Sequence, residues 1–119
     1  MSREVYLLGD QTCLSMPRIA VVGTRAVSPY GVRVTEQFVA ALVSAGYVIV
    51  SGLALGVDAI AHRTAIKMGG KTIAVLAHGL DYCYPLVHKG LRKKILDTGG
   101  LLASAYPEGN RPTREQFFV

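Results

Sequence analysis

The sequence predicts an α/β domain with a doubly wound, Rossmann-like, three-layer fold around a mainly parallel sheet. Short, continuous apolar runs alternate with segments whose apolar residues recur at helical spacing, in the order β-α-β-α-β-α-β. This alternation is typical of parallel strands joined by right-handed crossovers, with helices on both faces of the sheet. At 119 residues, the chain is long enough for one such domain.

The first strand is expected at residues 19–22, an apolar run that is too short for a helix. Because the run is continuous, we expect it to be buried on both faces. A helix should follow, with Ser28 as a candidate N-cap and Pro29 at the first helical position. Gly46 is expected to end this helix.

The remaining elements continue the same alternation. The next strands are expected at residues 47–51, 71–77 and 101–104, and the next helices at about 57–68 and 86–98. Residues 4–8 are expected to form an additional strand at the edge of the sheet.

The charge balance favours a negatively charged ligand. Lys and Arg outnumber Asp and Glu by 13 to 8, which gives a net charge of +5, so a polyanion or a phosphorylated ligand is expected. A basic charge that serves only solubility is the alternative. Cys13 and Cys83 lack metal-site or CxxC spacing, and there is no signal peptide or long apolar run. We therefore expect reduced thiols, a cytoplasmic location and no contact with a membrane.

Glycine-bearing polar loops follow the predicted strands. In an open parallel sheet, ligands bind at the carboxyl ends of the strands, where loops and helix N-termini converge. Glycines there let the backbone approach a phosphate closely, although glycines also end strands in any α/β protein. The candidate phosphate-binding residues of these loops are Gly23, Thr24, Arg25, Ser51, Gly52, Gly56, Asp58 and Gly79.

Arg25 is the most informative of these residues, because a guanidinium just past the first strand can bind phosphate oxygens bidentately. The alternative is a surface arginine paired with a carboxylate. Thr24, Ser28 and Ser51 each offer a hydroxyl to phosphate, and Ser28 fits the role of helix cap equally well.

Asp58 falls in the first turn of a predicted helix, where a carboxylate caps amides as readily as it contacts a ligand. His62 lies one turn further along. A pair at this spacing suggests acid–base chemistry, but a histidine packed on the inner face of a helix is the more common arrangement.

Lys89, Arg92 and Lys93 share one face of the last predicted helix and form a basic ridge. The ridge is explained by a solvated helix face, or by contact with successive phosphates of a nucleic acid strand. In the second case, Tyr82 or Tyr84 would stack on bases.

The sequence lacks the motifs of several common enzymes. There is no P-loop, no dinucleotide-binding Gly-x-Gly-x-x-Gly and no nucleophile elbow. The three histidines form no metal-ligand set. We therefore expect no catalytic residue, no metal and no cofactor.

Taken in order, these motifs resemble the DprA/Smf family of DNA-processing proteins. The resemblance rests on residues 19–25 (IAVVGTR), 28–31 (SPYG), 51–58 (SGLALGVD), 61–62 (AH) and 69–85 (GGKTIAVLAHGLDYCYP). It implies an extended Rossmann domain that dimerises, and a non-catalytic protein of natural transformation that binds single-stranded DNA and helps to load RecA. By position, Arg25 resembles an arginine of the family's DNA-binding pocket, and Lys89 a basic residue on the same surface.

The sequence also departs from the family pattern. Members usually carry Arg at the position of Leu55, Asn near His88 and Glu at the position of Ala105. The sequence stops at Val119, before the family's Arg-Asn-Arg segment, so residues 1–119 are expected to form a single, partial domain of this type.

Two other functions stay open. The first is a protein that binds or hydrolyses a small nucleotide, as in the lysine-decarboxylase-like superfamily, whose Pro-Gly-Gly-x-Gly-Thr loop is absent from this sequence. The second is a chain with no independent activity.

Overall fold

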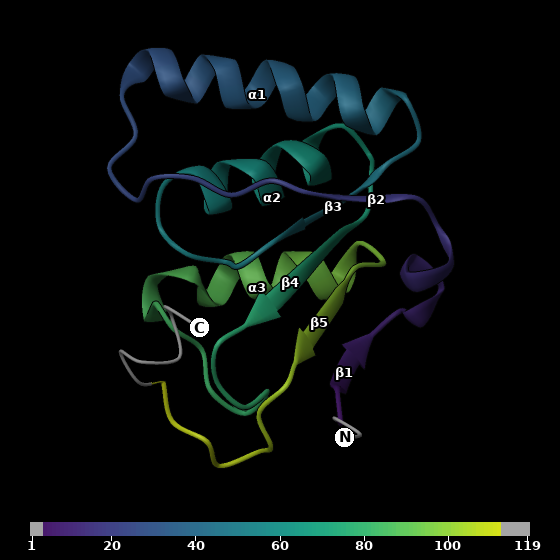
Figure 1. Cartoon of the computed structure of the whole chain (residues 1–119), viewed down its shortest axis with the longest axis vertical. Helices are drawn as coiled ribbons and strands as arrows, with labels where there is room; N and C mark the ends of the chain where they lie inside the picture. Colours follow the sequence, from purple (N-terminus) through teal and green to yellow (C-terminus); the bar gives the residue numbers. More distant parts are fainter. Residues whose placement is uncertain (1–3, 113–119) are drawn as a thin grey trace.

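The computed structural model of the protein describes residues 4–112. Its core is a five-stranded sheet with the order β1-β5-β4-β3-β2 (Figure 1). Strands β2 to β5 are parallel, and β1 pairs antiparallel with β5 at one edge. The strands are β1 (Tyr6–Gly9), β2 (Arg18–Ala20), β3 (Val48–Ser51), β4 (Thr72–Leu76) and β5 (Leu101–Ser104).

The α-helices of the described residues connect the parallel strands. They are α1 (Pro29–Ser44), α2 (Val57–Lys67) and α3 (Lys89–Asp97), and short 3₁₀ helices lie at η1 (Gln11–Ser15) and η2 (Leu86–His88). The predicted α/β class, the mainly parallel sheet and the edge strand at β1 are confirmed. The predicted third helix is divided, because η2 precedes α3.

The ends of α1 follow the sequence signals. Ser28 is the N-cap, its Oγ accepts a hydrogen bond from the Gly31 N–H at 3.0 Å, and Pro29 is the first helical residue. After the last turn, Gly46 adopts a φ of +93°, which is the left-handed conformation that ends helices.

The α-helices of the described residues cover one face of the sheet. Ile49 packs with α1 and α2, and Ala74 and Leu102 pack with α2 and α3. Figure 1 shows α2 and α3 behind the strands. Each crossover steps in the same direction, from β2 to β3 to β4 to β5, and right-handed crossovers in one direction place their helices on the same face. The expected helical layer on the second face is therefore absent from residues 4–112.

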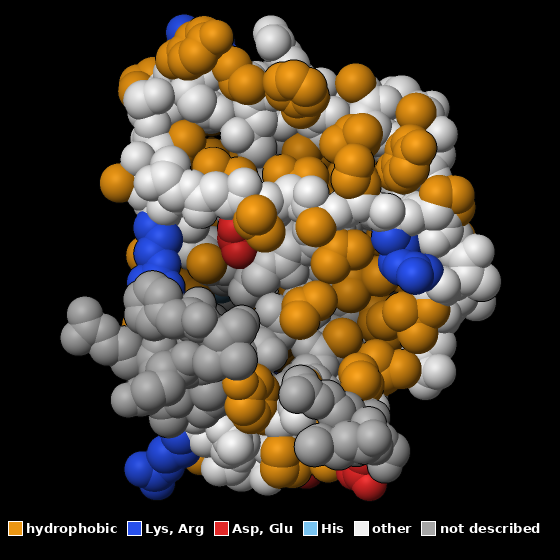
Figure 2. Space-filling model, in the orientation of Figure 1, with side chains coloured by type: hydrophobic (Ala, Val, Ile, Leu, Met, Phe, Trp, Pro, Cys, Tyr) orange, Lys and Arg blue, Asp and Glu red, His pale blue; other side chains and the backbone are white. Residues whose placement is uncertain are grey.

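The second face of the sheet carries apolar side chains, and some of them are less buried than those under the helices. Val48, Ile73 and Leu101 form a cluster with Cys13 of η1. At the same face of β4, two residues beyond Ile73, Val75 remains 50% exposed. Figure 2 shows this face in the orientation of Figure 1, with hydrophobic side chains gathered over the strands.

The prediction that residues 19–22 are buried on both faces is wrong. All three residues of β2 are exposed, and Val22 beyond its end is 73% exposed. Among the described residues β2 pairs only with β3, so it is an edge strand. A continuous apolar run indicates a strand of a parallel sheet but does not tell a central strand from an edge strand.

No helix within residues 4–112 has both the length and the apolar character that crossing a bilayer requires.

Candidate nucleic-acid interface

The loops that follow β2 and β3 dock against each other and place Arg25. Gly56 has a φ of +76°, and a Cβ atom there would lie 2.2 Å from the Thr24 carbonyl oxygen and 2.6 Å from that of Arg25. The adjacent Val57 N–H donates to the Thr24 carbonyl at 3.1 Å. A glycine at position 56 is therefore required for the second loop to touch the backbone that carries Arg25.

The second loop is fixed through the peptide groups of Leu53, a buried non-glycine residue with a φ of +60°. Its N–H donates to Nε2 of His62 at 3.2 Å, and its carbonyl accepts from Nδ1 of His88 at 2.8 Å. His62 Nδ1 donates to Thr72 Oγ1 at 2.7 Å, and that hydroxyl donates to the Ile49 carbonyl at 2.8 Å. His62 is therefore neutral, with its proton on Nδ1.

Burial lowers the pKa of His62 to about 3, and its electrostatic interactions with His88 and Arg63 lower it further. Asp58 is also buried, and its Oδ2 accepts from the Gly52 N–H at 3.0 Å. The two members of the suggested acid–base pair thus each accept a hydrogen bond from the backbone of the same loop. Both residues therefore have the structural role that was the alternative to acid–base chemistry.

The predicted hydroxyl donors have different surroundings. Ser51 is buried, and its Oγ donates to the Val21 carbonyl at 2.6 Å, across the β2–β3 pair. Ser28 caps α1. Thr24 is exposed, and its Oγ1 accepts from the Ala26 N–H at 3.1 Å, a contact that shapes the turn beside Arg25. Of these three residues, Thr24 is exposed on the loop that carries Arg25. The hydroxyl of Ser51 is instead bonded to a backbone carbonyl beside the sheet.

Gly79 lies apart from the Arg25 loop. It is buried, its N–H donates to the Asn110 carbonyl at 2.9 Å, and an added Cβ would lie 2.5 Å from the Pro107 carbonyl oxygen. The loop after β4 therefore packs against the segment after β5.

Arg25 is exposed and lines two adjoining hollows that also share Leu55. The smaller hollow includes Tyr84 and Pro85. The larger is an open groove of about 530 Å³, here named the Arg25 groove, which runs along the first half of α2. Its lining includes Arg25, Leu55, Gly56, Ile60, Arg63 and Val87.

The basic ridge of α3 is a separate surface. Lys89, Arg92 and Lys93 line a hollow of about 550 Å³ together with Leu8 and Leu96, and this hollow shares no residue with those around Arg25. Lys89 and Lys93 are exposed, whereas Arg92 is half-buried and its guanidinium donates to the Leu80 carbonyl. Lys89 and Arg25 do not line a common hollow.

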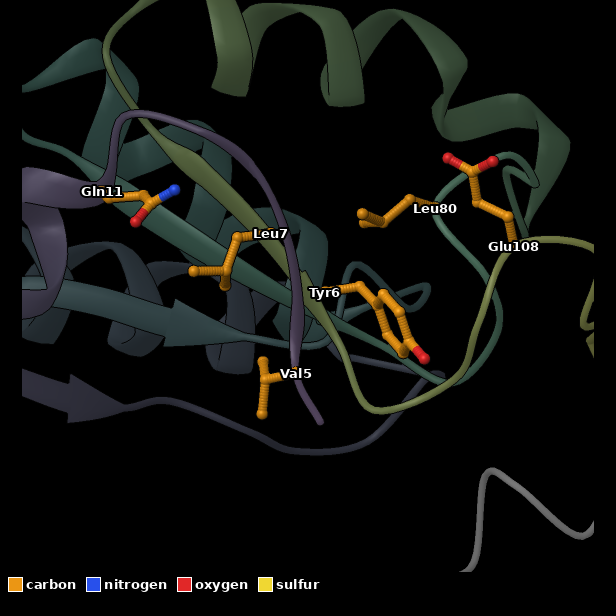
Figure 3. A pocket seen from close by; sticks show the side chains of 6 residues that line it. All are labelled: Val5, Tyr6, Leu7, Gln11, Leu80 and Glu108. Atoms are coloured by element: carbon orange, nitrogen blue, oxygen red, sulfur yellow. The ribbon is translucent and has the colours of Figure 1, made fainter. Parts of the chain in front are cut away.

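Another hollow, of about 570 Å³, lies at β1 (Figure 3). Of the described residues that line it, the charged one is Glu108, which would repel a polyanion. In Figure 3, Val5 and Leu7 point to one side of β1 while Tyr6 and Leu80 lie on the other. The hollow therefore straddles an exposed strand edge and offers no cationic group to a phosphate.

Residues 4–112 contain no group of three or more His, Cys, Asp or Glu side chains arranged to hold a metal ion. Burial raises the pKa of the thiols of Cys13 and Cys83, which keeps both protonated and disfavours them as metal ligands.

A family model described as DNA recombination-mediator protein A matches residues 2–119. The chain belongs to this family. It is 41% identical over 113 residues to the DNA processing protein DprA of Streptococcus pneumoniae, and 44% identical over 102 residues to the protein Smf of Synechocystis. These matches cover 95% and 86% of the chain, but only 39% and 25% of the two relatives.

Solved structures of the recombination-mediator family have the same fold. The crystal structure of S. pneumoniae DprA matches 95% of the chain with a TM-score of 0.87 at 41% identity, and the chain covers 39% of it. A Helicobacter pylori structure, described in terms of the single-stranded DNA binding mode of DNA processing protein A, matches 95% of the chain with a TM-score of 0.85 at 35% identity. The chain covers 51% of that structure. The predicted resemblance is therefore confirmed.

Sequence reasoning missed the structural role of His88 and the position of Arg63 in this recombination-mediator domain. The hydrogen bond between His88 and the Leu53 carbonyl joins residues 35 positions apart, so no local sequence pattern predicts it. Arg63 had a usable signal, because Gly56, Ile60 and Arg63 are spaced by four and three residues and so share one face of α2.

Gly56→Ala should lower the free energy of unfolding by on the order of 3 kcal/mol, because the methyl group meets backbone atoms of the Arg25 loop in an already unfavourable conformation. Gly69→Ala controls for the positive φ, since Gly69 has the same φ of +76° but nothing within 4 Å of its added Cβ, whereas Gly56 combines its contacts with a ψ of −129°. It should cost only about 1 kcal/mol. Urea unfolding of the two variants measures the difference, and equal losses would contradict the close packing of the two loops.

Stability should fall as the pH drops from 6.5 toward 3, because the unfolded chain then takes up a proton on His62 that the folded protein does not bind. This single group contributes a slope of at most about 1.4 kcal/mol per pH unit. His62→Gln should be less stable at neutral pH and should lose that part of the slope. Urea midpoints across this pH range test the prediction, and parallel curves for the two proteins would refute it.

Proposed function

We propose that this domain binds single-stranded DNA through the Arg25 groove, as part of a protein of DNA uptake and recombination. The supporting observation is the position of Arg25, exposed at the carboxyl ends of the parallel strands and lining a groove of about 530 Å³. The net charge of +5 favours a polyanion. The H. pylori structure, whose description concerns single-stranded DNA binding, is similar along 95% of this chain.

A single strand suits the lining of the groove better than a duplex. Exposed apolar side chains lie beside Arg25, with Leu55 46% exposed, Val87 75% and the Tyr84 ring 48%. Unpaired bases have free faces that can pack on such groups, whereas in a duplex the bases are stacked on each other. The proposal therefore combines phosphate contact at Arg25 with base contact at Tyr84.

The proposed activity is binding without catalysis. Asp58 and His62, the one acid–base pair suggested by the sequence, are both buried and bonded to backbone amides of the loop after β3. A depressed His62 pKa of about 3 also leaves little basicity for proton abstraction. We further propose that the protein acts in the cytoplasm, forms a homodimer or another oligomer and has RecA as a protein partner, as the family resemblance implies.

Arg25→Ala should weaken binding of a fluorescent single-stranded oligonucleotide by roughly tenfold, the effect expected for loss of one charge-assisted phosphate contact. The slope of log affinity against log salt concentration should become shallower by about 0.7. Fluorescence anisotropy across a salt series measures both quantities. Lys94→Ala, which removes the same charge from an exposed position of α3, should leave the slope close to that of the wild type.

The matching duplex and AMP serve as competing ligands in the same assay. Preference for the single strand supports the proposal. Binding of AMP alone would favour the small-nucleotide function instead, and absence of binding to all three ligands would show that residues 1–119 do not form a DNA-binding unit.

A further inference from the structure

We propose that Arg63 is a second phosphate-binding residue, so that a single strand lies along the first half of α2 with phosphates at both Arg25 and Arg63. This inference rests on the proposed function and extends it to the path of the strand. It assigns a role to a residue outside the loops that the sequence pattern indicated.

Arg25 and Arg63 belong to different elements but line the same groove. Arg25 follows β2, and Arg63 lies in the second turn of α2, seven positions after Gly56. A rise of about 1.5 Å per residue places Arg63 roughly 10 Å along the helix from the point where the two loops touch. The proposal assigns different phosphates of one strand to the two guanidinium groups, which requires a ligand with several phosphates.

The electrostatics of the groove favour an anion at Arg63. Among residues 4–112, no Asp or Glu lines the groove. Arg63 is exposed, and within residues 4–112 no carboxylate forms an ion pair with it. The nearest acidic residue in the sequence, Asp58, is buried and bonded to the Gly52 N–H. A ligand phosphate would therefore meet Arg63 without displacing a protein carboxylate.

Apolar side chains line the groove together with its two cations. Leu55 and Val87 are 46% and 75% exposed, and Ile60 is half-buried beside them. A groove lined by two cations and by apolar groups suits a strand that carries both phosphates and bases. On the proposed path, a mononucleotide contacts only one of the two cations. The groove is thus suited to an oligonucleotide.

The length of the ligand gives a specific test. Arg63→Ala should weaken binding of a short oligothymidylate by roughly tenfold and reduce the salt slope by about 0.7, the value for one lost phosphate contact to a single strand. Binding of thymidine monophosphate should be unchanged in Arg63→Ala and weakened in Arg25→Ala. Arg63→Lys should recover most of the oligonucleotide affinity, because it keeps the charge.

Two controls separate binding from folding. Lys94→Ala removes one positive charge from α3, outside the groove, and should leave the slope near that of the wild type. Urea unfolding of Arg63→Ala should give the wild-type midpoint within error, because Arg63 is exposed on a helix that tolerates alanine.

If Arg63→Ala binds the oligonucleotide with wild-type affinity and slope while Arg25→Ala is weakened, the role of Arg63 is refuted and the proposed function stands. An equal loss in Arg63→Ala for the mononucleotide and the oligonucleotide would also refute the path along α2. If the wild-type protein binds no oligonucleotide at all, the proposed function itself fails.

Discussion

The conformation of the loop after β3 depends on how the peptide groups of Leu53 are held. Leu53 has a positive φ and a fully buried side chain, so its backbone polar groups cannot turn to water. His62 accepts from its N–H and His88 donates to its carbonyl, from two elements that are separated in the chain by the whole of β4. The loop held in this way brings Gly56 against the backbone of Arg25. The position of the proposed phosphate contact therefore depends on two buried histidines that never touch the ligand.

This arrangement couples the interior to the surface charge. His62 holds Leu53 only as a neutral base, and both burial and the nearby positive charge of Arg63 lower its pKa. The cation that we assign to the second phosphate thus also helps to keep the loop's internal acceptor unprotonated. The same positive potential that attracts a polyanion is compatible with His62 as the buried acceptor beneath it, because His62 is neutral.

The sequence predicted the features that local chemistry determines. Ser28, Pro29 and Gly46 set the ends of α1, and the apolar runs located the parallel strands. The sequence could not show that the Ser51 hydroxyl donates to the Val21 carbonyl, because that hydrogen bond joins residues 30 positions apart. The exposure of β2 was missed for a similar reason, since an apolar run does not reveal how many neighbours a strand has. Local patterns thus located the loop that carries Arg25, while the use of each polar side chain depended on contacts between distant parts of the chain.

The strand order places the loop that carries Arg25 at an edge of the sheet. Among the described residues the parallel strands advance in one direction only, from β2 to β5, and an antiparallel strand, β1, lies beyond β5. Within these residues, the carboxyl end of β2 therefore has a neighbouring strand on one side only, that of β3. On that side the loop after β3 supports the loop after β2, through the hydrogen bond from the Val57 N–H to the Thr24 carbonyl. The buried hydrogen bonds that hold the loop after β3 thus also determine where the loop with Arg25 lies.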